Sequence, residues 1–355
     1  MSRALRLGVL YGDGIGPEVV GAAVEVARVA LAAAGAPAVE WVELPMGREA
    51  IRCHGAPLPE VSRRALEACD GWVMGPHDSA SYPPEHRRAR APSGELRHHF
   101  RLYANVRPAR TFEGLAARAG PADLVIVREN TEEFYPDRNV VRGSGEWMPS
   151  PDVAISVGVF TRGAAERVAH YACELARRRR RRLTIVHKAS VIRLGMGLWL
   201  ETCRRVAADY PDVVTTDALA DAMAALLVRQ MGDFDVVLTT NMIGDLLSSL
   251  AAELVGSLGL GASLNVGDGV AMAQAAHGAA PDLAGRDLAN PAGEILSVAM
   301  LLRWLAEQRQ AAALAAAAAR IEAALERTFA AGARTADLGG ALGTRAFTQA
   351  VVANL

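Results

Sequence analysis

One lysine, Lys188, stands among the 38 lysine and arginine residues of the chain, and all the others are arginines. Arginine stays charged at any working pH, whereas the pKa of a lysine can be lowered until the amine exchanges protons near neutrality. An ordinary surface position tolerates either residue. We therefore interpret Lys188 as a group that does acid–base chemistry, with a single surviving surface lysine as the alternative.

Five arginines in two neighbouring segments could bind an acidic substrate. They are Arg97, Arg101, Arg107, Arg110 and Arg128. Guanidinium groups bind carboxylates through charge-assisted hydrogen bonds, each worth roughly 1.5–3 kcal/mol. Three such side chains that converge would hold a molecule with two or more carboxylates, although each arginine taken singly is more often a surface residue.

Three aspartates in the second half of the chain could bind a metal ion. Asp217 and Asp221 precede Ala222-Met223 on an expected helix, and Asp245 follows residues 239–244. Carboxylate oxygens beside a 2-hydroxy acid suit Mg²⁺ or Mn²⁺. An isolated aspartate at the start of a helix is more often an N-cap.

Two glycine-containing loops could bind a nucleotide. The turn Gly12-Asp13-Gly14-Ile15-Gly16-Pro17 has the spacing G-x-G-x-G, which fits the Rossmann fingerprint poorly because that fingerprint needs G-x-G-x-x-G and an acid after the next strand. The loop His277–Asp282, followed by Asn290-Pro291, could wrap around a ligand. Its acid could bind ribose hydroxyls and would repel a 2′-phosphate.

The elements that must position these residues alternate between short apolar strands and longer helices, which predicts an α/β fold. The expected strands are 5–10, 72–74, 123–127, 154–159, 183–187 and 236–240, and the expected helices are 19–34, 164–180, 193–209, 218–231, 245–256, 296–319 and 320–331. The chain has 355 residues, about half of them apolar. This is enough for a large core divided between two domains.

Composition argues against several classes of partner. The formal net charge of −1 gives no overall field that would favour nucleic acid or an anionic membrane. The run Arg177–Arg182 is interpreted as a solvated helix end, with a nucleic-acid contact as the alternative. No apolar run reaches the ~20 residues of a membrane span, and residues 1–10 lack signal-peptide character. Four scattered cysteines favour free thiols in a reducing compartment, so a cytoplasmic location is expected.

Several motifs, in order along the chain, resemble those of the β-decarboxylating dehydrogenases, the family of isocitrate, isopropylmalate, homoisocitrate and tartrate/D-malate dehydrogenases. The matching segments are Gly12–Glu18, Leu102–Pro108, Arg128–Glu132, His187–Ala189, Asp221–Met223, Asn241–Leu247, and His277–Asp282 with Asn290-Pro291. The resemblance extends from about residue 5 to the C-terminus. It implies a two-domain fold that binds NAD without a Rossmann unit.

The resemblance also implies boundaries and an assembly. Residues 1–102 and 256–355 would form a discontinuous NAD-binding domain. The inserted residues 103–255 would form a substrate and dimerisation domain, and two subunits would share each active site.

Roles follow for the residues that match the family motifs. Arg97, Arg107 and Arg128 match the arginines that bind substrate carboxylates. Tyr135 matches the tyrosine that protonates the product carbon. Lys188 and Asp221 match catalytic residues that the second subunit contributes, and Asp221 and Asp245 match ligands of Mg²⁺ or Mn²⁺.

The same resemblance assigns the cofactor loop. His277, Gly278, Ala280 and Asn290 match the adenosine-binding residues. Asp282 matches the acid that selects NAD, where NADP-dependent relatives carry a lysine.

Four residues depart from the family pattern. They are Glu133 for a glycine, Ser190 for an asparagine, Gln274 for a glutamate, and Ser249 for a third aspartate one helical turn after Asp245. These departures favour an alternative, a non-catalytic or regulatory paralogue. Retention of the arginines and of the sole lysine opposes it.

The segment 87–95 bears on the substrate. Isopropylmalate enzymes place a leucine near the position of Ser93, and isocitrate enzymes place serine and asparagine at the positions of Ala91 and Ser93. Here the segment is polar and basic. The expected substrate is therefore a malate-type 2-hydroxy diacid with a small or anionic 3-substituent, oxidised and decarboxylated with NAD.

Overall fold

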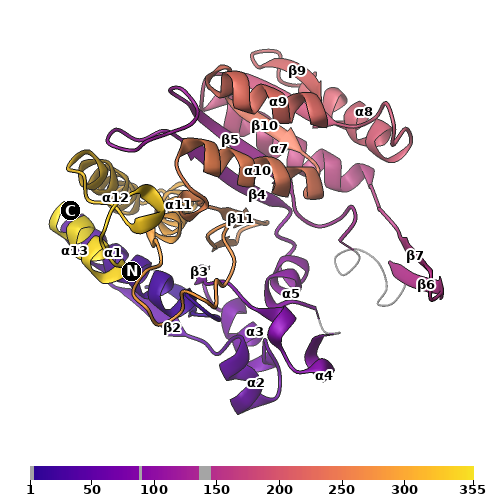
Figure 1. Cartoon of the computed structure of the whole chain (residues 1–355). Helices are drawn as coiled ribbons and strands as arrows, with labels where there is room; N and C mark the ends of the chain where they lie inside the picture. The colour runs from indigo at the N-terminus through magenta and orange to yellow at the C-terminus, as the bar shows by residue number, and fades with distance from the viewer. Residues whose placement is uncertain (1–3, 88–89, 136–144) are drawn as a thin grey trace.

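The computed structural model describes residues 4–87, 90–135 and 145–355, and a ten-stranded mixed sheet runs through it (Figure 1). In spatial order the strands are β2 (Val39–Glu43), β1 (Leu5–Leu10), β3 (Gly71–Met74), β12 (Ala271–Ala273), β11 (Leu264–Val266), β4 (Ala104–Arg110), β5 (Asp123–Glu129), β10 (Val236–Thr239), β8 (Arg182–His187) and β9 (Val214–Leu219). A separate hairpin joins β6 (Glu146–Ser150) and β7 (Val153–Ser156).

Helices cover both faces of this sheet. They are α1 (Gly16–Ala33), α2 (Arg48–His54), α3 (Glu60–Glu67), α4 (Pro84–Arg87), α5 (Pro92–His99), α7 (Arg162–Arg177), α8 (Gly195–Ala207), α9 (Ala220–Gln230), α10 (Asn241–Val255), α11 (Ala292–Arg309), α12 (Ala312–Ala330) and α13 (Thr344–Ala353). The α/β fold class is therefore confirmed.

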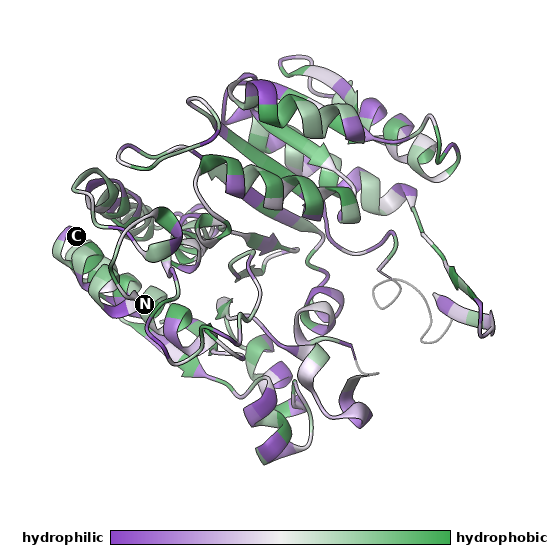
Figure 2. Ribbon diagram, viewed as in Figure 1, coloured by the Kyte–Doolittle hydropathy of each residue, from purple (hydrophilic) through white to green (hydrophobic). Residues whose placement is uncertain are grey.

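Side-chain alternation along the strands assigns the helices to the two faces. On β8, Leu183 and Ile185 pack into the same core as α7 and α8, whereas Val186 packs with α9 and α10. Successive side chains of a strand point to opposite faces, so a strand buried on both faces reads as a continuous apolar run. Figure 2 shows the apolar residues on these strands and on the helix faces turned toward them.

The other half of the sheet is built from both ends of the chain. Strand β3 lies parallel to β1 and to β12, and α1 packs against α11, α12 and α13. Strand β11 then pairs antiparallel with β4 and joins this half to the rest of the sheet. The last hundred residues therefore complete a layer that the first hundred begin.

The C-terminal helices and the segment around Asp217 differ from the expected elements. The C-terminal helices break at Gln310-Ala311 rather than at residue 320, because Gln310 takes a left-handed conformation (φ 50°) and its N–H closes α11 on the carbonyl of Ala306. The alanine-rich sequence carries no breaker there. Asp217 lies in β9, paired with Ile185, rather than on a helix. The β-branched run that precedes it favours a strand.

The arginine run after α7 is not a free helix end. Arg179 pairs with the fully buried carboxylate of Asp235 at 2.8 Å, and Arg177 pairs with Asp212 at 3.0 Å. The interpretation of a solvated helix end is wrong for Arg179, which also pairs with Asp123 of β5 and so ties the end of α7 to the sheet, whereas Arg177 is exposed as expected. Among the described residues, no helix is both long and apolar enough to cross a membrane.

A buried acid lies in the first turn of α11. Glu294 has no exposed surface and accepts one hydrogen bond, from the N–H of Ala275 at 2.6 Å. Burial disfavours its charged form and raises the pKa of the carboxyl to about 8. In the unfolded chain the same group titrates near 4.5.

We predict that Glu294→Gln stabilises the protein at pH 8 but not at pH 5. Between the two pKa values the unfolded chain releases this proton and the folded chain keeps it, so the wild type loses stability as pH rises through that window. The gain at pH 8 should be several kcal/mol, roughly 1.4 kcal/mol for each pH unit of the window, measured by urea unfolding. Glu113→Gln in an exposed turn is the control. An equal gain at both pH values would contradict a protonated Glu294.

Candidate active site

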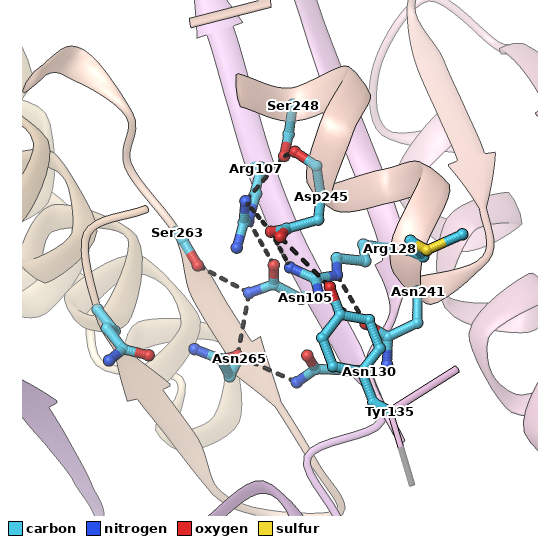
Figure 3. Close-up of polar contacts among 12 residues, drawn as sticks. Asn105, Arg107, Arg128, Asn130, Tyr135, Asn241, Asp245, Ser248, Ser263 and Asn265 are labelled. Carbon is cyan, nitrogen blue, oxygen red and sulfur yellow. Dashed lines mark hydrogen bonds and ion pairs between the residues drawn. The ribbon is translucent and has the colours of Figure 1, made fainter. Parts of the chain in front are cut away.

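Two buried arginines on adjacent strands meet one carboxylate. Arg107 on β4 and Arg128 on β5 are 6% and 2% exposed. Nη1 of Arg107 lies 3.1 Å from Oδ1 of Asp245, and Arg128 pairs with the same oxygen (Figure 3). Asp245 lies on α10, whose first turn follows β10, so three neighbouring elements converge here.

The charges in this cluster constrain one another. Burial raises the pKa of Asp245, but the positive charges of Arg128, Arg107 and Arg97 outweigh it, so the pKa lies below its usual range. Burial and the charge of Arg128 lower the pKa of Arg107 to about 10, which leaves that guanidinium charged at neutral pH. Three positive charges therefore surround one negative charge.

Amides and hydroxyls fix the two arginines. Oδ1 of Asn105 accepts a 2.6 Å hydrogen bond from Nε of Arg107, and Ser248 accepts one at 2.8 Å. Oδ1 of Asn241 accepts from Nε and Nη2 of Arg128 at 3.0 and 2.6 Å. The sequence analysis did not select these supporting residues individually. Their only clue in the sequence is proximity to selected residues, since Asn105 lies two residues before Arg107 and Asn241 four residues before Asp245.

The Asn105 amide continues into a buried chain of polar groups. It donates to Ser263 at 2.7 Å and to Asn265 at 3.0 Å, and Asn130 donates to Asn265 at 3.0 Å (Figure 3). This chain joins β4 and the end of β5 to β11. The arginines are thus anchored on both sides of the β4–β11 junction.

Helix α5 presents a third arginine on the same side. Arg97 is 7% exposed and donates to Oε1 of Gln274 at 3.3 Å. Ser93, one helical turn earlier, is bonded to Nε2 of His77 at 2.8 Å. Its segment continues into residues 88–89, which lie outside the described residues. His77 was missed by sequence reasoning, although it closely follows β3.

The two remaining candidate arginines do not join the cluster. Arg110 pairs with Glu326 of α12 at 2.5 Å and lies over the ring of Phe112. Arg101 is exposed at the end of α5. Three of the five arginines therefore converge, as the carboxylate-binding prediction requires.

Tyr135 lies over this cluster. Its hydroxyl donates to Oδ2 of Asp245 at 3.4 Å, and the guanidinium carbon of Arg128 is 5.5 Å from the centre of its ring. The family resemblance implies that Tyr135 protonates the product carbon, and the structure places its side chain beside Asp245 and Arg128.

Lys188 and Asp221 form a second cluster. Nζ of Lys188 is 2.5 Å from Oδ1 of Asp221, in the first turn of α9, and this bond lowers the pKa of the carboxyl. The Asp221 side chain is 69% exposed. Among the ion pairs of the described residues, none links these two to Arg107, Arg128 or Asp245. Within the described residues, Lys188 and Asp221 therefore pair with each other and not with the arginine cluster.

A single chain also fits a metal ion only in part. No group of three or more acidic, histidine or cysteine side chains that could hold a metal occurs in the described residues. Asp217 is engaged by Arg204 and by His187 at 3.3 Å. The exposed Asp221 and the half-exposed Asp245 offer hard oxygen ligands.

The two glycine-containing loops contact each other directly. Ile15 N–H donates to the carbonyl of Ala279 at 2.9 Å. Gly14 has φ 59°, and a Cβ there would lie 1.9 Å from that carbonyl oxygen. A cavity of about 400 Å³ beside this contact is lined by Gly12, Gly14, Arg48, Arg52 and Pro281, among others.

The other predicted cofactor residues share this loop region. His277 bonds to the carbonyl of Gly278 at 3.1 Å, and burial lowers its pKa. Ala280 has φ 38°, and Asp282 is exposed. Asn290 donates to Asp337 at 3.0 Å, a contact that sequence reasoning missed.

Over residues 6–352 the chain matches the family model described as isocitrate/isopropylmalate dehydrogenase. The chain belongs to this dehydrogenase family. It is 42% identical over 353 residues to the isocitrate/homoisocitrate dehydrogenase of Thermus thermophilus, covering 98% of each chain. It is 38% identical to the 3-isopropylmalate dehydrogenase of Archaeoglobus fulgidus, covering 99% of each. The crystal structure of isocitrate dehydrogenase from Methylococcus capsulatus superposes with a TM-score of 0.87 at 37% identity, covering 99% of both chains.

The four residues that depart from the family pattern occupy different environments. Ser249 is half-buried one turn after Asp245, and Ser190 is exposed near Lys188. Gln274 accepts from Arg97 without neutralising its charge. Glu133 is buried with a positive φ of 78°.

Close packing of α10 on β5 depends on Gly244. A Cβ there would lie 2.6 Å from Cγ of Arg128.

We predict that Gly244→Ala lowers the free energy of unfolding in urea by about 1–3 kcal/mol, because the added methyl overpacks Arg128. The matched control Gly197→Ala, on α8 with nothing within 4 Å, should gain roughly 0.5–1 kcal/mol. Similar behaviour of both variants would exclude a tight α10–Arg128 contact.

Proposed function

We propose that this chain is an NAD- and Mg²⁺- or Mn²⁺-dependent dehydrogenase that oxidises and decarboxylates a 3-substituted, malate-type 2-hydroxy diacid. The observation that carries this proposal is the excess of buried positive charge at Arg97, Arg107 and Arg128 over the single carboxylate of Asp245. Buried charges need counterions, and a substrate with two carboxylates supplies them. The printed names of the relatives, isocitrate/homoisocitrate and 3-isopropylmalate dehydrogenase, are of this substrate class.

The chain's own residues divide the work. The three arginines bind and orient the two carboxylates, with Asp245 and the Asp221 of a second copy as metal ligands. The bound cation would supply stabilisation of oxyanion charge, and the bound nicotinamide would supply the acceptor for the hydride of C2. Lys188 of the second copy takes the proton of the 2-hydroxyl. As the β-carboxylate leaves as CO₂, its bonding electrons pass to C3, and Tyr135 donates a proton there.

This scheme requires a homodimer with shared active sites. The Lys188 and Asp221 side chains pair with each other at 30% and 69% exposure and make no ion pair with the arginines in the described residues. Two large apolar side chains are also exposed, Leu194 at 89% six residues after Lys188 and Leu246 at 66% next to Asp245, and they suit a subunit interface. We assign this dimerisation and substrate role to residues 103–255, and cofactor binding to residues 1–102 with 256–355.

The cofactor would occupy the junction of the glycine turn and the 277–290 loop. His277, Gly278, Ala280 and Asn290 would hold the adenosine, and the exposed carboxylate of Asp282 would bind ribose hydroxyls and repel a 2′-phosphate. This chemistry selects NAD and needs no Rossmann unit. The four cysteines are all free thiols, which fits the cytoplasm.

The surroundings of Ser93 indicate which kind of 3-substituent the substrate carries. Its hydroxyl and His77 form a polar pair one helical turn from Arg97, which suits a polar group better than an isopropyl group. A small or anionic substituent is therefore favoured. The loss of a carboxylate at Ser249 favours the second candidate, a non-catalytic or regulatory paralogue, because it weakens the metal site.

We predict NADH formation with Mn²⁺ and at least one diacid from a panel of D-malate, tartrate, isocitrate, homoisocitrate and 3-isopropylmalate. Isopropylmalate should have the lower kcat/KM by about 10-fold or more, since a mismatched apolar group costs roughly 1–3 kcal/mol. Absorbance at the NADH band measures the rates. No turnover on any diacid would favour the paralogue, and an isopropylmalate rate at the top of the panel would refute the specificity argument.

We further predict that two inactive variants complement each other. Lys188→Arg keeps the charge but loses the removable proton, and Tyr135→Phe loses the acid, so each should lower kcat by about 10²–10⁴. Random pairing of the two chains makes mixed dimers with one intact site each, which restores about a quarter of wild-type activity.

Co-refolded single variants are the control for this experiment. Mixing without any recovery, although mixed dimers form, would mean that each active site belongs to one chain.

A further inference from the structure

Glu133 adopts a backbone conformation that side chains rarely take. Its φ is 78°, and the residue is only 1% exposed. Its N–H donates to the carbonyl of Val159 at 2.9 Å, and its own carbonyl accepts from Val159 at 3.1 Å. The left-handed region disfavours residues with a Cβ, and the family motif that this segment resembles has glycine here. A side chain kept at this strained position needs a compensating interaction.

That interaction is made with the N-terminus of α10. Oε2 of Glu133 accepts the N–H of Met242 at 2.5 Å. Thr240, which precedes the helix, makes no side-chain capping bond, and the first turn of α10 contains no acid. The first N–H groups of a helix lack partners within it and favour a nearby negative charge. Glu133 supplies an acceptor for one of these N–H groups from another segment, although burial raises the pKa of its carboxyl.

The neighbouring residues bind the same end of α10. Asn241 donates to the carbonyl of Glu132 at 3.0 Å and accepts from Arg128. Residues 128–133 therefore wrap around the start of the helix that carries Asp245. Tyr135 follows two residues later, with its hydroxyl 3.4 Å from Asp245.

We propose that Glu133 is a positioning residue that holds Tyr135 against Asp245 by tying the Tyr135 segment to the first turn of α10. The role of Tyr135 as the acid rests on the proposed function. Glu133 acts on the protonation of C3 and leaves hydride transfer unaffected, because it bonds to neither the arginines nor Lys188 in the described structure. Its departure from glycine is thus an adaptation of the site and not a sign of decay.

The experiment compares three variants of the full-length protein. Glu133→Gly relaxes the backbone but removes the acceptor, and Glu133→Gln keeps an acceptor for Met242. Arg181→Gly is the matched control, since Arg181 has φ 58°, is exposed and lies at the opposite ends of the strands. Each is assayed for hydrogen exchange at the Met242 amide and for nitration of Tyr135 by tetranitromethane, mapped by mass spectrometry.

Kinetics then separate the two chemical steps. In Glu133→Gly, the single-turnover rate of NADH formation should match that of the wild type, while the steady-state rate falls roughly 10- to 100-fold, as a displaced catalytic group predicts. A burst of NADH should precede the slow phase. Glu133→Gln should restore most of the steady-state rate, and Arg181→Gly should change neither rate.

Several outcomes would overturn the proposal. If hydrogen exchange at Met242 or nitration of Tyr135 is unchanged in Glu133→Gly, Glu133 does not hold the Tyr135 segment against α10. Equal losses in single-turnover and steady-state rates would show a general structural effect. If the wild type turns over no diacid, the proposed function fails. The measurements of hydrogen exchange at Met242 and of nitration at Tyr135 then still decide whether Glu133 positions Tyr135.

Discussion

The arrangement of the candidate site depends on one carboxylate, Asp245, which faces three buried arginines. Arg107 and Arg128 are almost fully buried on adjacent strands, and both pair with the same oxygen of Asp245. A buried charge without a counterion costs several kcal/mol, so this carboxylate decides where α10 can lie on β4 and β5. The close approach at Gly244 follows from the same requirement. Arg97 adds a further positive charge, so one carboxylate, Asp245, faces three guanidinium groups.

Much of the chemistry could be predicted because it is local in sequence. The motifs around Arg107, Arg128 and Asp245 stand beside strands whose apolar runs are unambiguous, and the ends of neighbouring strands meet at one edge of a sheet. The partners of these residues could not be predicted in the same way. Asn105 reaches Asn265 only because β11 lies antiparallel beside β4, and that pairing joins segments about 160 residues apart.

The errors have the same origin. Nothing in the alanine-rich C-terminal segment marks Gln310 as a turn, since packing of α12 on α11 determines where the helices part. Asp217 looked like a helical residue because the expected helix began one residue later, whereas pairing with β8 places it on a strand. Lys188 is the opposite case. It was selected because it is the only lysine of the chain, but the structure of one chain shows only its pairing with Asp221.

The order of the strands has a consequence for synthesis on the ribosome. Strand β3 pairs with β12, and α1 packs against α11, α12 and α13, which emerge last. The apolar face of α1 stays uncovered until nearly the whole polypeptide has been made, whereas β5, β10, β8 and β9 with α7 to α10 form from one continuous stretch. Chains tend to fold by units as they emerge. The middle of this molecule can therefore fold first, and the N-terminal hundred residues must be kept from aggregating until translation ends.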